Sequence, residues 1–379
     1  MKITGIICEY NPLHLGHKKQ LDLIRAENPD SGIVCLMSGN FVQRGMPAIF
    51  DKTVRAKAAI LAGADLVLEL PTVYALSSAE GFAAGGVEIL SRFCDTLCFG
   101  AENADSERLM QLAKVLLSEA FSGALRLELE KGLSFPAARQ AALTAMGFDA
   151  SILELPNNIL AVEYCKAILA QGCSLSPMVI HREGGYHDTV ADKENPSATA
   201  LRQLMEEGNP WQDYVPDAAC FDGAALHTLQ QGEKAILYRL RTMTDAEFEA
   251  LPYGSEGLWR KLMHAARSEA TLENIIAATK SKRYTRTRID RMILCAFLGI
   301  TQEMLASPAP YVRVLALNDK GREILKKARQ NGQFVNIGEK QDDPYQALED
   351  RCGQLYGLLS SKTEEPDIES KYRIYYHRS

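Results

Sequence analysis

The residues with the clearest chemical potential lie near the start of the chain, in Cys8-Glu9-Tyr10-Asn11-Pro12-Leu13-His14-Leu15-Gly16-His17-Lys18. His14 and His17 are three residues apart, so both imidazoles lie on one face of a first helical turn. Such a turn also presents free backbone N–H groups and the positive end of the helix dipole, which favour phosphate. Gly16 has no side chain to block a nucleotide lying over the turn. The segment predicts a phosphate site at which two imidazoles donate hydrogen bonds as charge builds at phosphorus.

The alternative is that two histidines fall at a helix start by chance. Here an apolar strand, an Asn-Pro turn, a glycine and the histidine pair occur together, and this combination favours the functional interpretation.

A second candidate phosphate-binding turn is Ser197-Ala198-Thr199-Ala200-Leu201-Arg202, which resembles the Ser/Thr-rich turn before a helix that nucleotidyltransferases carry late in the domain. The resemblance implies that the hydroxyl groups of Ser197 and Thr199 and the backbone amides at the helix start hold β- and γ-phosphates, with Arg202 as counter-charge. Taken alone, Ser197 fits a plain helix N-cap equally well. Its occurrence with the paired histidines favours the phosphate-binding role.

Short apolar runs alternate with helical patterns through the first two hundred residues, and these elements must position both turns. This alternation is typical of a parallel sheet covered by helices on both faces, with the ligand at the carboxyl ends of the strands where their order reverses. We therefore expect an α/β fold with an N-terminal doubly wound, Rossmann-like parallel sheet. The expected strands are 3–9, 33–37, 66–70, 96–99 and 177–181, and the expected helices are 15–27, 51–62, 79–91, 105–146 and 157–171.

The pattern changes beyond about residue 203. Residues 222–305 are mostly helical in pattern, and residues 311–337 resemble a small strand-helix-strand element with a turn at 318–321. We predict a catalytic domain at 1–205 and a mainly α-helical C-terminal domain at 206–379 that contains this small α/β element. The mixed basic and aromatic tail at 371–378 is expected to form an edge strand.

Composition excludes several classes of protein. The 379 residues include 42 Lys+Arg and 48 Asp+Glu, so the net charge is 42 − 48 = −6, and 46% of residues are hydrophobic. These values fit a globular chain and exclude intrinsic disorder and a disulfide-stapled miniprotein. No apolar run is long enough for a membrane helix, and the N-terminus does not resemble a signal peptide, so a cytoplasmic location is expected. The nine cysteines form no CxxC pair and fit buried packing rather than zinc.

The HxGH sequence after the first strand resembles the nucleotidyltransferase superfamily, whose members act at the α-phosphate of ATP. The match extends along the chain and is similar to the bacterial tRNA(Met) cytidine acetate ligase family from residue 1 to about 337. It rests on Glu9-Tyr10-Asn11-Pro12, Met37-Ser38-Gly39-Asn40-Phe41-Val42-Gln43-Arg44-Gly45, Gly63-Ala64-Asp65-Leu66-Val67-Leu68-Glu69-Leu70-Pro71, Phe99-Gly100-Ala101-Glu102, Asn157-Asn158-Ile159-Leu160-Ala161 and Tyr186-His187-Asp188.

The resemblance implies a set of ATP-binding residues. Gly100 would lie against the nucleotide, Asn157 would bind the adenosine with Asn158 as the near alternative, and Arg182 would also contact the nucleotide. From the residues alone, Gly100 could merely end a strand, Asn157 could cap a helix, and Arg182 could be a solvated charge. The implied set is Ile7, Cys8, Glu9, Tyr10, Asn11, Pro12, Leu13, His14, Leu15, Gly16, His17, Lys18, Lys19, Gln20, Gly100, Asn157, Arg182, Ser197, Thr199 and Arg202.

The resemblance also implies the reaction. ATP would activate acetate as acetyladenylate, with His14 and His17 as the catalytic residues, and the acetyl group would pass to N4 of the wobble cytidine of elongator tRNA(Met). Mg²⁺ is expected with ATP, although no carboxylate cluster indicates a dedicated metal site. Two other functions stay open: another adenylyltransferase on the same fold, and a non-catalytic RNA-binding factor that keeps a nucleotide site.

A local concentration of basic residues lies at 280–291, where six of twelve residues are Lys or Arg. Apolar residues from Ile289 onward recur at helical spacing, so the helix can dock while its cations face phosphate. Tyr284 could stack on a base. A solvated helix face is the alternative, which the charge contrast with the acidic chain and the family resemblance together make the weaker one. The predicted tRNA-binding residues are Lys282, Arg283, Tyr284, Arg286, Arg288 and Arg291.

The polar residues after the second expected strand leave two interpretations open. They could orient acetate or RNA, or they could belong to a capped helix with an exposed face. These residues are Gln43, Arg44, Asp51, Lys52 and Arg55.

Overall fold

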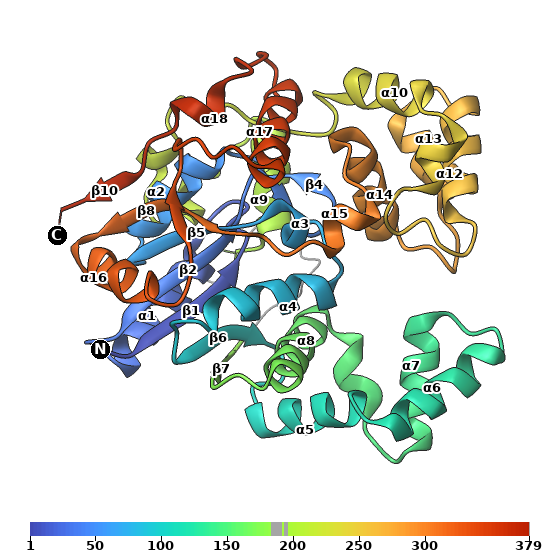
Figure 1. The fold of residues 1–379 in the computed structure, drawn as a ribbon, viewed down its shortest axis with the longest axis horizontal. Helices are drawn as coiled ribbons and strands as arrows, with labels where there is room; N and C mark the ends of the chain where they lie inside the picture. The colour runs from blue at the N-terminus through green and yellow to red at the C-terminus, as the bar shows by residue number, and fades with distance from the viewer. Residues whose placement is uncertain (183–191, 193–195, 379) are drawn as a thin grey trace.

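The architecture is a twisted sheet flanked by helices, with a helical unit to one side (Figure 1). The computed structural model describes residues 1–182, 192 and 196–378. The sheet order is β10-β8-β5-β2-β1-β6-β7, with β9 also paired to β8. The strands are β1 (Ile3–Cys8), β2 (Gly32–Ser38), β5 (Leu66–Leu70), β6 (Thr96–Ala101), β7 (Ser176–His181), β8 (Val312–Asn318), β9 (Phe334–Asn336) and β10 (Tyr375–His377), and β3 (Phe41–Val42) and β4 (Met46–Pro47) form a separate hairpin.

The helices fall into three groups along the chain. Those of the first half are α1 (Leu15–Glu27), α2 (Lys52–Leu61), α3 (Thr72–Ala75), α4 (Ala79–Leu90), α5 (Ser106–Leu116), α6 (Glu119–Glu130), α7 (Phe135–Ala145), η1 (Ala150–Glu154), α8 (Pro156–Gln171) and α9 (Ala198–Glu206). The middle group is η2 (Gln212–Tyr214), η3 (Ala218–Phe221), α10 (Glu233–Thr242), α11 (Asp245–Glu249), α12 (Leu258–Ser268), α13 (Leu272–Thr279), α14 (Arg286–Leu298) and α15 (Gln302–Ala306). The last group is α16 (Asp319–Ala328), α17 (Pro344–Tyr356), η4 (Gly357–Leu359) and α18 (Ile368–Lys371).

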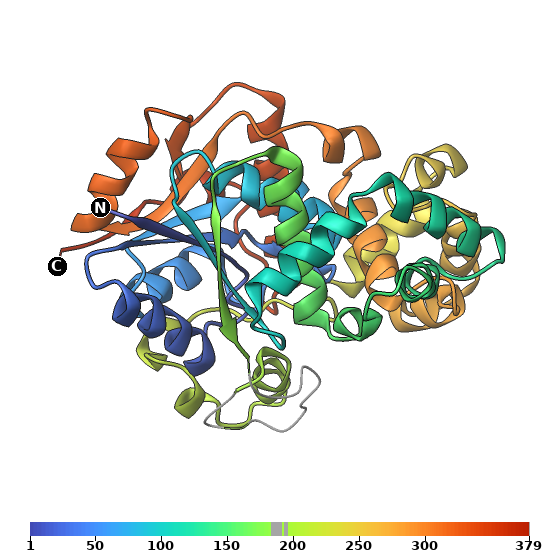
Figure 2. The same cartoon turned by 90° about the horizontal axis from the view of Figure 1, so that it is seen from below.

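The predicted doubly wound parallel sheet is confirmed. Strands β1, β2 and β5 are buried along their whole length, because helices cover both faces of the sheet (Figures 1 and 2). Alternate residues of β1 enter different cores: Ile7 packs with α4, α5 and α8, whereas Ile6 packs with α1 and α2. Strands β2 and β5 lie on one side of β1 and β6 lies on the other, so the strand order reverses between β1 and β6.

The small α/β element predicted for the C-terminal domain lies elsewhere than expected. Strand β8 pairs antiparallel with β5, and β9 and β10 pair with β8, so all three extend the N-terminal sheet. The reason is that β5 would otherwise leave an open edge, which the buried apolar strand β8 covers. The expected turn at 318–321 instead begins α16, with Asn318 as its N-cap, while β10 forms the predicted edge strand. The boundary at 205/206 stays a prediction.

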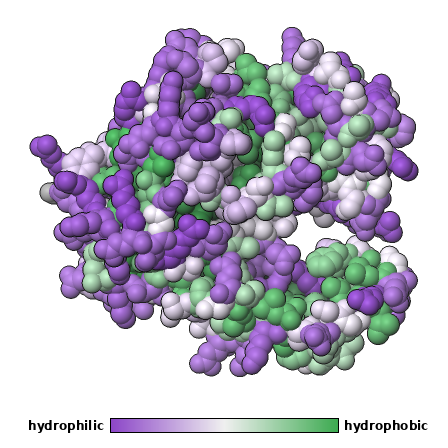
Figure 3. All heavy atoms as spheres, viewed as in Figure 1, coloured by the Kyte–Doolittle hydropathy of each residue, from purple (hydrophilic) through white to green (hydrophobic). Residues whose placement is uncertain are grey.

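The helical unit, α10–α15, has its own core, to which α3 and the β3–β4 hairpin contribute Val73 and Phe41. Figure 3 shows an open notch between this unit and the arm formed by α6 and α7. Among the described residues, the helices are all too short or too polar to cross a membrane.

Candidate active site

A cavity of about 290 Å³ opens where the strand order reverses, at the carboxyl ends of β1, β6 and β7. This is the position at which open α/β sheets bind their ligands. Its walls come from the loop after β1, the hairpin, α1, α8 and the start of α9. Most of the predicted ATP-binding residues line it: Ile7, Cys8, Glu9, Tyr10, Asn11, His14, Gly16, His17, Lys19, Gln20, Gly100, Asn157, Arg182, Ser197, Thr199 and Arg202.

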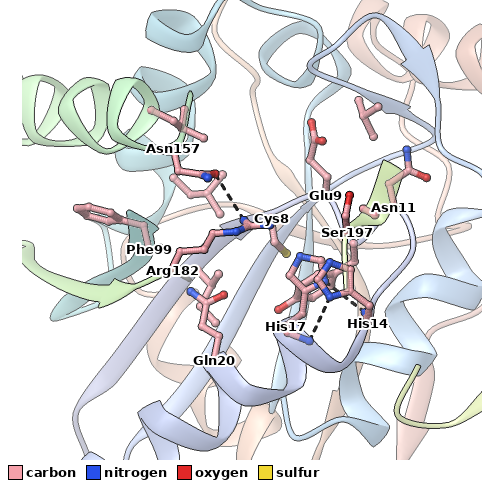
Figure 4. A pocket seen from close by; sticks show the side chains of 18 of the residues that line it. Cys8, Glu9, Asn11, His14, His17, Gln20, Phe99, Asn157, Arg182 and Ser197 are labelled. Atoms are coloured by element: carbon pink, nitrogen blue, oxygen red, sulfur yellow. Dashed lines mark hydrogen bonds between the residues drawn. The ribbon is translucent and has the colours of Figure 1, made fainter. Parts of the chain in front are cut away.

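The paired histidines form the start of α1. His14 is the N-cap, and its Nδ1 accepts a hydrogen bond from the Gly16 N–H (3.2 Å). His17 Nδ1 accepts from the His14 N–H (3.3 Å), so the two side chains complete a reciprocal capping box. The rings stack with centroids 3.7 Å apart, and Figure 4 shows both beside the cavity. The cap therefore fixes the two rings before any ligand binds.

These contacts determine which nitrogen carries the proton. Because both Nδ1 atoms accept, each neutral ring carries its hydrogen on Nε2. Burial, assisted by the Arg182 and Arg202 charges, lowers the pKa of His14 to about 3, and burial also lowers that of His17. Both rings are consequently neutral Nε2–H donors near pH 7. The His14 Nε2 is buried without a hydrogen-bond partner in the described part of the chain, which leaves a donor for a ligand.

The second predicted phosphate turn meets the first. Ser197 caps α9, and its Oγ accepts from the Ala200 N–H (3.5 Å). Arg202 reaches back to donate to the Asn11 carbonyl (2.7 Å) and to Thr199 Oγ1 (3.2 Å). Burial lowers the pKa of Arg202 to about 10, so it remains a cation at neutral pH. The two predicted phosphate turns thus lie side by side at the cavity, joined by the Arg202 contact to Asn11.

Asn157 and Asn158 have different environments. Asn157 lines the cavity, where its Nδ2 donates to Glu102 (2.7 Å) and its Oδ1 accepts from Arg182 (3.5 Å) (Figure 4). Asn158 is buried, and its Oδ1 accepts from the Asn103 N–H (2.8 Å). Of the two predicted alternatives, Asn157 is the one placed to contact a nucleotide. Gly100 lines the same side, and a Cβ there would lie 3.9 Å from Arg182.

Four residues of the predicted ATP-binding loop do not line the cavity: Pro12, Leu13, Leu15 and Lys18. Leu13 packs into the core under α1, and Lys18 forms an ion pair with Asp22 one turn along the helix. The sequence reasoning missed an apolar wall. Its members are Phe82, Phe99, Leu160, Tyr164 and Ile180, together with Val42 and Met46 from the hairpin.

The polar residues between 43 and 55 divide into two groups. Gln43 and Arg44 line the cavity, whereas Lys52 and Arg55 are fully buried. Arg55 donates to the Glu9, Ser38 and Phe50 carbonyls. Asp51 caps α2 as expected, but Lys52 and Arg55 do not lie on an exposed helix face. Arg55 therefore holds together the segments that follow β1 and β2.

The predicted tRNA-binding cluster is partly occupied by contacts within the chain. Arg286 forms a bidentate pair with Glu273 (2.7 and 2.8 Å), and Arg288 donates to the Tyr253 carbonyl (2.9 Å). The Tyr284 ring is buried and its hydroxyl donates to the Glu256 carbonyl, and Arg291 donates to the Gln43 carbonyl. Lys282 and Arg283 are exposed. Tyr284 is therefore not placed to stack on a base, because its ring belongs to the helical core.

Other reactive groups near the cavity have little capacity for chemistry. Burial raises the pKa of the Cys8 thiol well above its ordinary value, so it stays protonated. All nine cysteines lie in the described ranges and are free. No group of three His, Cys, Asp or Glu side chains is arranged for a metal ion among the described residues. Tyr186, His187 and Asp188, part of the sequence resemblance, lie outside them.

The fold and the histidine turn define the class of protein. The family model described as HIGH Nucleotidyl Transferase matches residues 1–371, so this chain belongs to that family. The chain is 35% identical to the tRNA(Met) cytidine acetate ligase of Clostridium perfringens strain SM101, with 99% of this chain and 98% of that protein aligned. It is 38% identical to the Clostridium novyi protein of the same name, over 87% of this chain and 88% of that one. Within the nucleotidyltransferases, the chain belongs to the tRNA(Met) cytidine acetate ligases.

Solved structures are similar over the whole chain. The apo crystal structure (form I) of Thermotoga maritima TmcAL superposes with a TM-score of 0.92 at 30% identity, covering 100% of both chains. The same protein bound with alpha-thio ATP superposes with a TM-score of 0.89 over the same extent.

Proposed function

We propose that this protein uses ATP to convert acetate to acetyladenylate and then acetylates N4 of the wobble cytidine of elongator tRNA(Met). The observation that carries the proposal is the pair of neutral imidazoles at the switch point, with the Nε2 of His14 buried and unpartnered within the described residues. The names of the relatives, tRNA(Met) cytidine acetate ligase, support the choice of substrates.

The first step needs positioning and charge stabilisation rather than covalent catalysis. An acetate oxygen attacks the α-phosphorus, the bond to the bridging oxygen of the β-phosphate breaks, and pyrophosphate leaves. The Nε2–H groups of His14 and His17 donate to phosphate oxygens that gain charge in the transition state. Ser197, Thr199 and Arg202 support the departing phosphates. Asn157 and Arg182 hold the adenosine end.

In the second step the cytidine N4 attacks the acetyl carbonyl, AMP leaves and N4 loses a proton. Mg²⁺ would accompany ATP through its phosphates, because Glu9, the one carboxylate among the described residues that line the cavity, already accepts from the Gln43 N–H (2.7 Å). For the tRNA we propose the helical unit, where Lys282 and Arg283 lie exposed in the loop between α13 and α14.

The test is ATP–pyrophosphate exchange with acetate, propionate or a nucleotide monophosphate, each with and without elongator tRNA(Met). Acetate-dependent exchange, followed by transfer of labelled acetate to the tRNA, is the expected result. Exchange driven by a nucleotide monophosphate alone would identify a dinucleotide-forming adenylyltransferase. Tight RNA binding without exchange for any second substrate would identify a non-catalytic factor.

A further inference from the structure

The β3–β4 hairpin has one side in each half of the molecule. Phe41 is buried in the core of the helical unit, where its ring meets Tyr356 edge-on (centroids 5.8 Å apart). The next residue, Val42, lines the nucleotide cavity with Gln43 and Arg44. Successive side chains of an extended strand point in opposite directions, so one short hairpin contacts both regions. A displacement of the hairpin would therefore move a wall of the cavity.

The tip of the hairpin rests directly on helix α14. Gly45 adopts φ +80°, and a Cβ there would lie 2.3 Å from the Arg291 backbone nitrogen and 2.5 Å from the Asp290 carbonyl carbon. Arg291 also donates from Nη1 to the Gln43 carbonyl (3.2 Å). Its guanidinium lies 5.1 Å from the centre of the Tyr253 ring, which restricts its position. Backbone contact and a charged donor thus fix the hairpin on the helix.

The hairpin in turn holds the loop that precedes the histidines. The Gln43 N–H donates to Glu9 Oε1 (2.7 Å), and the Ile49 N–H, just past β4, donates to Asn11 Oδ1 (2.7 Å). Figure 4 shows Glu9 and Asn11 on the side of the cavity away from Phe99 and Asn157. A continuous series of contacts therefore runs from α14 through the hairpin to the side of the cavity opposite the adenosine end.

We propose that Arg291 and Gly45 are positioning residues for adenylate formation, and that the cavity wall they set, with Gln43 and Arg44, receives the carboxylate substrate. The naming of acetate rests on the proposed function. The wall combines the Arg44 guanidinium with the apolar side chains of Val42 and Met46. This combination suits a small carboxylate with a methyl group. The adenosine end, from β6, β7 and α8, is built without the hairpin.

The test uses steady-state exchange by the full-length protein, with KM measured for acetate and for ATP. Arg291→Met keeps the side-chain stem and removes the donor, Arg291→Lys restores one donor, and Gly45→Ala pushes the hairpin off α14. Gly147→Ala is the matched control, because Gly147 has φ +81° and a Cβ there would meet nothing within 4 Å.

Arg291→Met and Gly45→Ala are expected to lower kcat/KM for acetate by up to about 10²-fold, the loss that a misplacement of about 1 Å can cause. KM for ATP should stay within about twofold, since its contacts are unchanged. Arg291→Lys should recover most of the loss, and Gly147→Ala should match the wild type. The inference would be overturned if KM for ATP rose as much as KM for acetate. It would also be overturned if kcat/KM for acetate were unchanged in Arg291→Met or in Gly45→Ala. If the wild type exchanges with a different second substrate, the proposed function fails, and the same comparison is made with that substrate.

Discussion

Two polar regions lie at the side of the sheet where its parallel strands end. They differ in whether their charged and polar groups have partners within the protein. One is the nucleotide cavity after β1, β6 and β7. The other, which we call the ion cluster, lies at β5 and consists of Lys52, Glu69, Arg313, Glu349 and Glu369. Arg313 contacts the three carboxylates at 2.9, 3.0 and 3.1 Å, and Lys52 contacts two of them at 3.0 and 2.6 Å.

Each charged group of the ion cluster has an oppositely charged partner within the cluster. Glu349 also accepts from the Thr72 N–H (2.9 Å) and hydroxyl (2.8 Å), so α17 is joined to α3. In the cavity, by contrast, the His14 Nε2 is buried with no partner in the described chain, and the Arg202 cation lies close by. Buried charges and donors are costly unless they are paired. A buried polar region that satisfies itself stabilises the fold, and one that leaves a donor open is built for a ligand.

Arg313→Met tests the closed region and should have the largest effect. It leaves the buried Glu349 without its cation, and Glu69 and Glu369 with Lys52 alone. The free energy of unfolding should therefore fall by about 3–5 kcal/mol. Urea unfolding at pH 7 measures this change. Arg322→Met, at an exposed arginine on α16, is the control and should leave the free energy of unfolding nearly unchanged. A similarly small change for Arg313→Met would show that the cluster does not hold the C-terminal segment to the sheet.

The pH dependence of this variant has a definite sign. In the wild type, Arg313 and Lys52 outweigh burial and hold the pKa of Glu69 below its ordinary value. Glu69 therefore contributes stability at neutral pH that is lost as the pH falls below about 4. Without Arg313, burial raises the carboxyl pKa values, and the variant gains stability when these groups are protonated. The stability difference between wild type and Arg313→Met should consequently narrow from pH 7 to pH 5.

His14→Asn tests the open region without removing the helix cap. The Asn side-chain oxygen can accept from the Gly16 N–H in place of Nδ1, while the Nε2 donor is lost. Acetate-dependent exchange should fall by about 10²–10³-fold, which corresponds to about 2.7–4 kcal/mol, with the melting temperature unchanged. His14→Ala should lose the same activity and about 1 kcal/mol of stability in addition. Wild-type exchange by His14→Asn would show that the open donor has no part in catalysis.

The sequence was sufficient for the parallel strands and for the two helix starts that meet at the cavity, because these depend on local patterns. It could not assign β8 as the neighbour of β5 in the N-terminal sheet, since an apolar strand does not specify its partner. It also could not separate Asn157 from Asn158, because neighbouring positions on a helix differ only by a rotation that tertiary packing decides. The wall residues Phe82 and Tyr164 have the sequence pattern of ordinary helix cores.

The cations of the basic segment at 280–291 also fall into two groups, those that have a partner within the protein and those that do not. Spacing alone indicated one cationic face, yet Glu273 and the carbonyl of Tyr253 come from other helices and loops and occupy Arg286 and Arg288. These contacts join residues that lie far apart in the sequence. The sequence therefore could not show that Arg286 and Arg288 already have partners within the protein. Lys282 and Arg283 have no side-chain partner within the described part of the chain.

The smallest expected effect is that of Lys282→Ala with Arg283→Ala on tRNA binding. Each cation that neutralises a phosphate adds close to one unit to the slope of log K against log salt, so the double variant should flatten that slope by about one to two units. Its stability should stay within about 0.5 kcal/mol of the wild type, because both side chains are exposed. Arg286→Ala is the matched comparison: it breaks the bidentate pair with Glu273, so it should lower stability while leaving the salt slope unchanged. If Arg286→Ala flattens the slope and the double variant does not, Arg286 must release Glu273 to bind phosphate. An ion pair within the free protein would then no longer distinguish a structural charge from one that binds a ligand.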